Sequence, residues 1–239
     1  MKLQFITSIT ESYWNGIGKH CISSWDLPGE VVIYIDQQEG EVEWFNDIPY
    51  KKKLVPVPPL KVLNSSDDDD DNKTKTKTRK FWGKACAQIH AVRNRDPDTR
   101  IIWLDADIEQ IKPFKDTALF DWQFAHPVAL MKSNDWSPDC WETGLVMFNE
   151  NFEKMEVFLK RYESFWKDKE AMQTVYRPYD AMVLGAVATE YKGKFYNLCN
   201  NKCENVNALQ HTIFRHHLKH WINKTNKEIL KEKISNEDS

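Results

Sequence analysis

Residues 100–111 read RIIWLDADIEQI, and this stretch decides how the rest of the chain is interpreted. Four apolar residues, Ile101 to Leu104, form a short run with β-branched and aromatic character, which favours a buried strand of a parallel sheet. The run stops at Asp105, and a second carboxylate follows at Asp107. Because an unpaired buried carboxylate costs several kcal/mol, we expect both acids where the strand leaves the sheet, with a positive partner beside them.

A divalent metal ion is the partner that this pattern favours. In open α/β sheets, ligands bind beyond the carboxyl ends of the strands. Two carboxylates in a D-x-D arrangement can hold a hard cation between the protein and the phosphate oxygens of a ligand. The alternative is an ordinary strand-to-turn exit, since Asp is common in turns.

The composition favours one packed globular domain. The chain has 239 residues, is 41% hydrophobic and contains ten Trp, twelve Phe and eight Tyr, which together provide a sizeable core. The formal net charge of -3 gives no basic footprint for nucleic acid, so we expect no such partner. We recognise neither a leader peptide nor a membrane span of about 20 apolar residues, and a soluble, cytoplasmic protein is expected.

The cysteines indicate free thiols in a reducing compartment. There are five of them, an odd number, and none of the pairs has CxxC spacing. A disulfide framework or a zinc site is therefore not favoured.

The N-terminal part alternates between strand and helix patterns. A strand is expected at Leu3 to Ile9, a helix at about Tyr13 to Trp25, and a second strand at Val31 to Ile35, which ends at Asp36. This order is typical of a right-handed parallel α/β unit. A short third strand is expected at Glu41 to Phe45.

A flexible charged loop is expected at about residues 61–78, where an Asp run precedes a Lys/Thr tract. Residues 108–120 look like a turn with short helical pieces. Helices are expected at Phe81–Val92, Phe152–Trp166 and Asp180–Thr189, and strands at Phe124–Met131, Gly144–Phe148 and Lys194–Leu198. Residues 223–239 form a polar tail after a domain of residues 1–222.

Taken together, these pieces resemble a nucleotide-sugar glycosyltransferase of the GT-A fold. The most specific parts are LDAD at residues 104–107 and HHLKH at residues 216–220, and the resemblance extends roughly from Leu3 to Trp221. It implies a single α/β domain with a Rossmann-like, mostly parallel central sheet flanked by helices.

The resemblance also implies where a nucleotide would bind. It places Thr7, Ser8 and Tyr13 at the base and ribose, together with Asp36 at the end of the second strand. The alternative is that these residues are simply the polar strand ends of any α/β protein.

A basic residue from the helix before the acidic motif is implied at the sugar or diphosphate. Lys84 is the best placed, because it lies a turn inside the helix, whereas Arg79 and Lys80 lie nearer its start. A solvated basic face is the alternative for each of them.

The same resemblance implies the metal ligands. Asp107 and Asp105 would bind Mn²⁺ or Mg²⁺, and Asp105 would also contact the ribose or sugar of the donor. His216 would be the third ligand, with His217 and His220 as competitors, and Lys219 would contact the diphosphate. An imidazole ligand suits Mn²⁺ better than Mg²⁺.

Two further acids are implied at the reaction centre. Glu142, next to Trp141, would hydrogen-bond a sugar, and Asp180 would face the reacting carbon. The alternatives are a solvated turn residue for Glu142 and a helix-capping residue for Asp180.

The function that follows is metal-dependent transfer of a sugar from a nucleoside-diphosphate sugar, with a UDP-hexose favoured, to a hydroxyl of a glycan or other acceptor. A HAD-like phosphatase with Asp105 as the nucleophile is one alternative. A non-catalytic module that binds nucleotide sugars is the other.

Overall fold

The structure is a computed structural model. It describes residues 1–35, 44–55, 57–58, 71–113, 125–132, 141–175, 179–191, 196–197 and 214–216. For residues 44, 71–77, 131–132, 141–142, 196–197 and 214–216 the description is of the backbone only.

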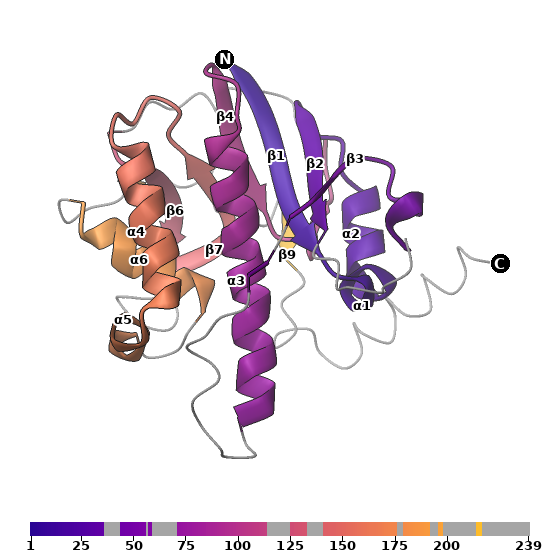
Figure 1. The fold of residues 1–239 in the computed structure, drawn as a ribbon. Coiled ribbons are helices and arrows are strands. Elements are labelled where there is room, and N and C mark those ends of the chain that lie inside the picture. Colours follow the sequence, from indigo (N-terminus) through magenta and orange to yellow (C-terminus); the bar gives the residue numbers. More distant parts are fainter. Residues whose placement is uncertain are drawn as a thin grey trace.

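The core of the molecule is a seven-stranded sheet with the order β3-β2-β1-β4-β7-β6-β8 (Figure 1). The strands are β1 (Lys2–Ile9), β2 (Glu30–Ile35), β3 (Lys51–Leu54), β4 (Thr99–Leu104), β6 (Val128–Lys132), β7 (Trp141–Phe148) and β8 (Tyr196–Asn197). Strand β7 is antiparallel to its neighbours β4 and β6, and the other pairings are parallel. The expected α/β fold with a mostly parallel central sheet is confirmed.

Helices cover both faces of this sheet. The helical elements are α1 (Glu11–Tyr13), the π-helical turn η1 (Trp14–Gly18), α2 (Lys19–Ser23), the 3-10 turn η2 (Trp44–Asp47), α3 (Asp71–Arg93), α4 (Met155–Lys167), α5 (Lys169–Thr174) and α6 (Asp180–Thr189). One apolar core joins the sheet to α3, α4 and α6. The other joins the opposite face to the segment η1–α2. Figure 1 shows α3 crossing in front of the strands and α2 on the other side.

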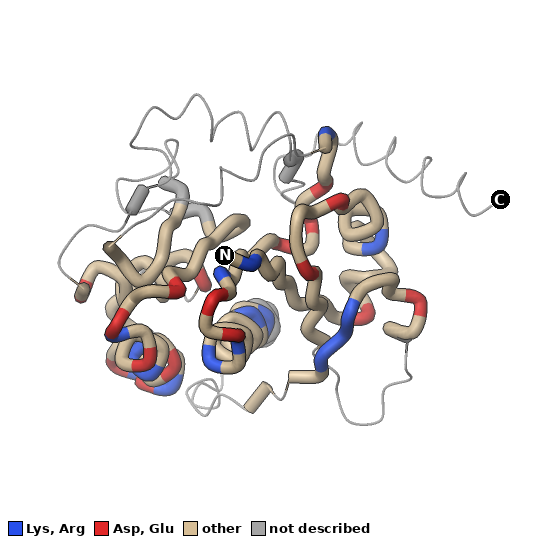
Figure 2. The backbone as a smooth tube through the Cα atoms, turned by 90° about the horizontal axis from the view of Figure 1, so that it is seen from above, with Lys and Arg blue, Asp and Glu red and all other residues tan. Residues whose placement is uncertain are grey.

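Charged residues lie on the outer surfaces of α3 and α4, which Figure 2 shows nearly end-on. Arg93 at the end of α3 pairs with Glu156 at 3.1 Å and with Glu163 at 3.0 Å, so ion pairs join the two helices at their exposed edge. Within the described part of the chain, no helix has both the length and the apolar character needed to cross a bilayer.

All six residues of strand β4 are buried. It lies between β1 and β7, and its first half includes a charged residue, Arg100. The Arg100 guanidinium donates two hydrogen bonds of 2.7 Å to the Glu150 carboxylate, and both side chains are almost fully buried. This bidentate ion pair fixes the start of β4, the strand that precedes Asp105.

Glu150→Gln should lower the free energy of unfolding by about 3 kcal/mol at pH 7, because it leaves the buried Arg100 charge uncompensated. Burial raises the pKa of Glu150, but the Arg100 hydrogen bonds outweigh burial and hold the pKa below its usual value. A depressed carboxyl pKa contributes stability above the unfolded pKa of about 4.3, and this is lost as the pH falls further.

The urea-unfolding difference between Glu150→Gln and wild type should therefore shrink below about pH 4. Glu153→Gln, at an exposed neighbouring position, is the matched control and should be close to neutral. An equal stability of wild type and Glu150→Gln at pH 7 would contradict the assigned role of the pair.

Several expected elements are corrected. The third strand is not Glu41–Phe45: residues 41–43 lie outside the described residues, and Trp44 starts the turn η2. The strand that pairs with β2 is β3, with the sequence KKKL. This strand contains three lysines and therefore has no apolar run that would predict it. Charged side chains suit an edge strand, where they discourage pairing with a further strand.

The segment after the acidic motif is also corrected. Ile108–Gln110 forms strand β5, not a turn with helical pieces, and it pairs antiparallel with β9 (Phe214–His216). The expected helix at Tyr13–Trp25 is interrupted, because Gly16 has ψ of -115° and kinks it.

The loop expected at residues 61–78 is wrong over its last part, because α3 begins at Asp71. Residues 61–70 lie outside the described residues, as does the expected tail at 223–239. Lysine is a good helix former, and extending a packed helix costs little once it is nucleated. The Lys/Thr tract can therefore be helical without an apolar stripe.

Candidate active site

The acidic motif lies where β4 ends. The Asp105 N–H donates to the carbonyl of Gly144 at 2.9 Å, and the Ile108 N–H donates to the Asp105 carbonyl at 3.0 Å, so the chain turns tightly before β5. The indole N–H of Trp103 donates to the Asp105 Oδ1 at 2.6 Å. Residues two apart on a strand share a face, which places Trp103 beside the carboxylate.

Lys84 is the cation at the centre of the cluster. Its Nζ lies 2.7 Å from Asp105 Oδ1, 2.6 Å from Asp180 Oδ2 and 2.9 Å from the Thr143 carbonyl oxygen. Burial lowers the pKa of Lys84, but the two carboxylates outweigh burial and raise it above its usual value. Its three N–H groups therefore face acceptors of the protein itself, which also include the Thr143 hydroxyl oxygen at 3.3 Å.

The expected contact of Lys84 with a donor stays a prediction, and the structure adds contacts within the protein that the sequence did not indicate. The resemblance implied contact with a sugar or diphosphate, whereas the structure shows a buried ammonium between Asp105 and Asp180. Lys84 thus joins the acidic motif to the start of α6. Arg79 and Lys80, one turn earlier on α3, are exposed.

Asp180 is nearly buried, with an exposed fraction of 5%. Besides the Lys84 contact, its Oδ2 accepts a hydrogen bond from the Thr143 hydroxyl. The N-cap of α6 is Tyr179, and no side-chain capping bond is present there. Asp168, in contrast, caps α5 by accepting from the N–H groups of Glu170 and Ala171. Helix capping therefore does not explain Asp180.

Asp107 lies on the side of the motif that faces α1. Its exposed fraction is 9%, and it shares a side-chain hydrogen bond with Tyr13. Burial first, and then the negative charges of Asp107 and Asp105, raise the pKa of the Tyr13 phenol far above its usual value. Tyr13 therefore stays protonated and donates to Asp107.

The small sheet β5–β9 brings the C-terminal histidine segment to the acidic motif. Ile108, directly after Asp107, is paired in register with His216. Facing Cα atoms of an antiparallel pair lie about 5 Å apart. Strand β5 is itself fixed to the end of α2, because the Trp25 indole donates to the Ile108 carbonyl at 2.7 Å.

The net negative charge of the cluster favours binding of a cation. Asp105 and Asp180 share the Lys84 ammonium, and Asp107 follows two residues after Asp105, so these three carboxylates and one ammonium leave a formal balance of two negative charges. Among the described side chains, no group of three His, Cys, Asp or Glu is placed to hold a metal. The carboxylates fit a hard divalent ion, and a third ligand would come from the His216 segment.

The remaining predicted site residues have different positions. Thr7 is fully buried, whereas Ser8 is half-buried and is the more accessible of the two. The Thr7 hydroxyl has no hydrogen-bond partner among the described atoms. Glu142 lies on β7, but only its backbone is described. Asp36, Lys219, His217 and His220 lie outside the described residues.

Two contributors to the site were missed from the sequence. The Trp103 indole was taken only as part of an apolar run, although its position two residues before Asp105 was a usable signal. Thr143 gave no usable signal, because its contact with Asp180 depends on how β7 pairs with β6.

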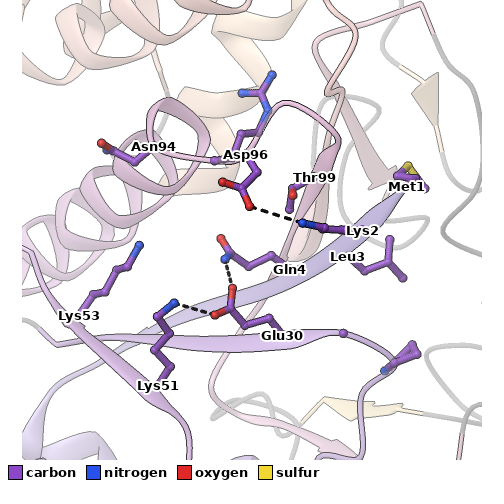
Figure 3. A pocket seen from close by; sticks show the side chains of 13 residues that line it. Met1, Lys2, Leu3, Gln4, Glu30, Lys51, Lys53, Asn94, Asp96 and Thr99 are labelled. Carbon is purple, nitrogen blue, oxygen red and sulfur yellow. Dashed lines mark hydrogen bonds and ion pairs between the residues drawn. The ribbon is translucent and has the colours of Figure 1, made fainter.

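A cavity of about 690 Å³ lies at the other end of the sheet (Figure 3). Lys2, Glu30 and Lys51, which begin β1, β2 and β3, line it. Lys51 pairs with Glu30 at 2.7 Å and Lys2 with Asp96 at 3.8 Å. Strand β4 separates this cavity from the acidic motif by about 17 Å, so it is not part of the candidate active site.

No protein-family model matches the sequence, and a comparison with curated proteins finds no match. The structure is similar to the glycosyltransferase GlyE from Streptococcus pneumoniae TIGR4. For the apo form, the TM-score is 0.54 at 12% identity, over 91% of this chain and 55% of GlyE. A second GlyE structure gives 0.54 at 11% identity, with the same coverage.

A glycosyltransferase involved in the glycosylation of the major capsid of PBCV-1 gives a TM-score of 0.45 at 13% identity, over 95% of this chain and 98% of that one. This chain spans about half the length of GlyE. The similarity to GlyE supports the fold: this is a GT-A type glycosyltransferase fold, as the sequence resemblance implied.

Proposed function

We propose that the protein is a metal-dependent glycosyltransferase that moves a sugar, with a UDP-hexose as the favoured donor, to a hydroxyl of a glycan or other acceptor. The observation that carries the proposal is the cluster at the end of β4. It combines two motif acids, a third acid on α6 and a histidine strand paired beside them, on the fold of a glycosyltransferase.

Asp107 and Asp105, with His216, would hold the ion, and Mn²⁺ suits this mixed oxygen and nitrogen set. When bound, the ion supplies Lewis-acid stabilisation of the nucleoside diphosphate as it leaves. Tyr13 holds the Asp107 carboxylate by a hydrogen bond. Lys84 bridges Asp105 and Asp180 and so joins the acid on α6 to the motif at the end of β4.

The test is a thermal-shift and calorimetry screen of UDP, UDP-hexoses and GDP-mannose, with Mn²⁺ and with EDTA. At a ligand concentration a hundred times Kd, binding adds about 2.7 kcal/mol, so the Tm should rise by about 5 to 10 °C. The rise should require Mn²⁺, and UDP-sugar should be hydrolysed or transferred.

Two other outcomes would replace the proposal. Turnover of a generic aryl phosphate that Asp105→Asn abolishes, without any response to nucleotide sugars, would identify a phosphatase. Metal-dependent nucleotide binding without hydrolysis or transfer to any acceptor would identify a binding module.

A further inference from the structure

We propose that Thr143 is a positioning residue that holds Asp180 for the reaction, an inference that rests on the proposed glycosyltransferase function. Thr143 is buried, and both of its polar groups contact the ion pair. The hydroxyl donates to Asp180 Oδ2 and accepts a longer bond from Lys84 Nζ at 3.3 Å, and the backbone carbonyl accepts from Lys84 Nζ at 2.9 Å. One residue thus contacts both members of the buried ion pair.

Lys84 alone does not fix the Asp180 carboxylate. An ammonium is a compact charge on a flexible stem, and this one is shared between Asp105 and Asp180 at nearly equal distances of 2.7 and 2.6 Å. Helix capping does not orient the carboxylate either, since no side-chain capping bond is present at the start of α6. The directional O–H of Thr143 is therefore the bond that selects one orientation of the carboxylate.

A bulge in β7 places Thr143 in this position. Leu130 of β6 pairs with Val146, but the next residue, Met131, pairs with Glu142. Three residues of β7 therefore lie between two consecutive pairs, and such bulges redirect side chains near functional sites. Within the bulge, the Gly144 carbonyl accepts from the Asp105 N–H at 2.9 Å. The bulge therefore contacts Asp105 through Gly144 and Asp180 through Thr143.

Thr143→Val tests the hydroxyl, because it keeps the branched shape and removes the O–H donor. A hydrogen bond to a charged group corresponds to about a 10- to 100-fold effect, so kcat for sugar transfer should fall by about that factor. The KM for the UDP-sugar and the Mn²⁺-dependent affinity for UDP should change less, by no more than about threefold, because Thr143 bonds to Asp180 directly and is linked to Asp105 through Lys84.

Thr143→Ser retains the hydroxyl and should restore kcat to within about threefold of wild type. Thr189→Val is the matched control on the same helix as Asp180: its hydroxyl bonds to the Ala186 carbonyl at 2.6 Å, and kcat should be unchanged. A wild-type kcat in Thr143→Val would overturn the inference. Equal losses in the Val and Ser variants would also overturn it, because they would assign the effect to packing.

Urea unfolding of wild type, Thr143→Val, Asp180→Ala and the double variant tests the contact without any turnover. Thr143→Val should destabilise the wild type more than it destabilises Asp180→Ala. Strictly additive effects would overturn the inference even in an active enzyme. If the effects of the two substitutions on stability are not additive but the protein turns over no nucleotide sugar, the contact between Thr143 and Asp180 is confirmed. The proposed function, in contrast, is then contradicted.

Discussion

Asp107→Asn should remove Mn²⁺-dependent binding of UDP. Asparagine has nearly the same shape as aspartate and can still accept the Tyr13 hydrogen bond, but it carries no charge for a cation. Asp107 is 9% exposed and is followed directly by Ile108, whose register partner is His216, so it is the expected carboxylate ligand nearest to the histidine strand. The affinity for UDP with Mn²⁺ should fall by about a hundredfold or more.

Calorimetric titration of UDP into Asp107→Asn, with Mn²⁺ and with EDTA, measures this effect. Asp96→Asn is the matched control, since Asp96 pairs with Lys2 on the surface at the far end of the sheet. It should bind UDP like wild type. Full Mn²⁺-dependent affinity in Asp107→Asn would remove Asp107 from the metal site.

Asp180→Asn should abolish most turnover while leaving nucleotide binding in place. The substitution removes a fixed negative charge from a buried position beside Lys84 and Thr143. Preorganised charges of this kind contribute about a hundred- to a thousandfold to kcat, and we expect a loss of that size. The Mn²⁺-dependent affinity for UDP should stay within about threefold of wild type.

Steady-state kinetics combined with UDP calorimetry separate the two effects. Asp168→Asn provides the control for an aspartate at a helix N-terminus, because Asp168 caps α5 and lies outside the cluster. Asparagine caps a helix about as well as aspartate, so only the charge–dipole contribution is lost, and the variant should cost less than about 1 kcal/mol of stability with unchanged kcat. If Asp168→Asn and Asp180→Asn had the same mild effect, Asp180 would be a structural residue.

Much of the fold could be predicted from local patterns. The apolar runs of β1, β2 and β4 and the Ala-rich α6 are found within one or two residues of their expected bounds, and α6 matches at both ends. Buried strands and helices leave this trace because burial selects apolar side chains with a regular period. Strand β3 has no such apolar pattern, because its residues are mostly lysines at the edge of the sheet, and lysines do not indicate which strand it pairs with.

The site was only partly predictable, for a related reason. The D-x-D motif and Asp180 stood out because acids after a buried strand or at a helix start are conspicuous in a sequence. The role of Lys84 depends on two carboxylates from distant elements meeting at one ammonium. Thr143 depends on a bulge set by strand pairing. Neither the role of Lys84 nor that of Thr143 could be predicted from a local sequence pattern.

The central claim is that the acids at the end of β4 hold a cation that binds the donor's diphosphate. Anomalous diffraction from crystals soaked with MnCl₂ and UDP tests it most directly. One strong manganese peak is expected at about 2.0 to 2.6 Å from an Asp107 carboxylate oxygen, with an imidazole nitrogen of His216 also bound and the diphosphate alongside. UDP bound with no manganese at Asp107, or manganese bound elsewhere on the protein, would contradict it.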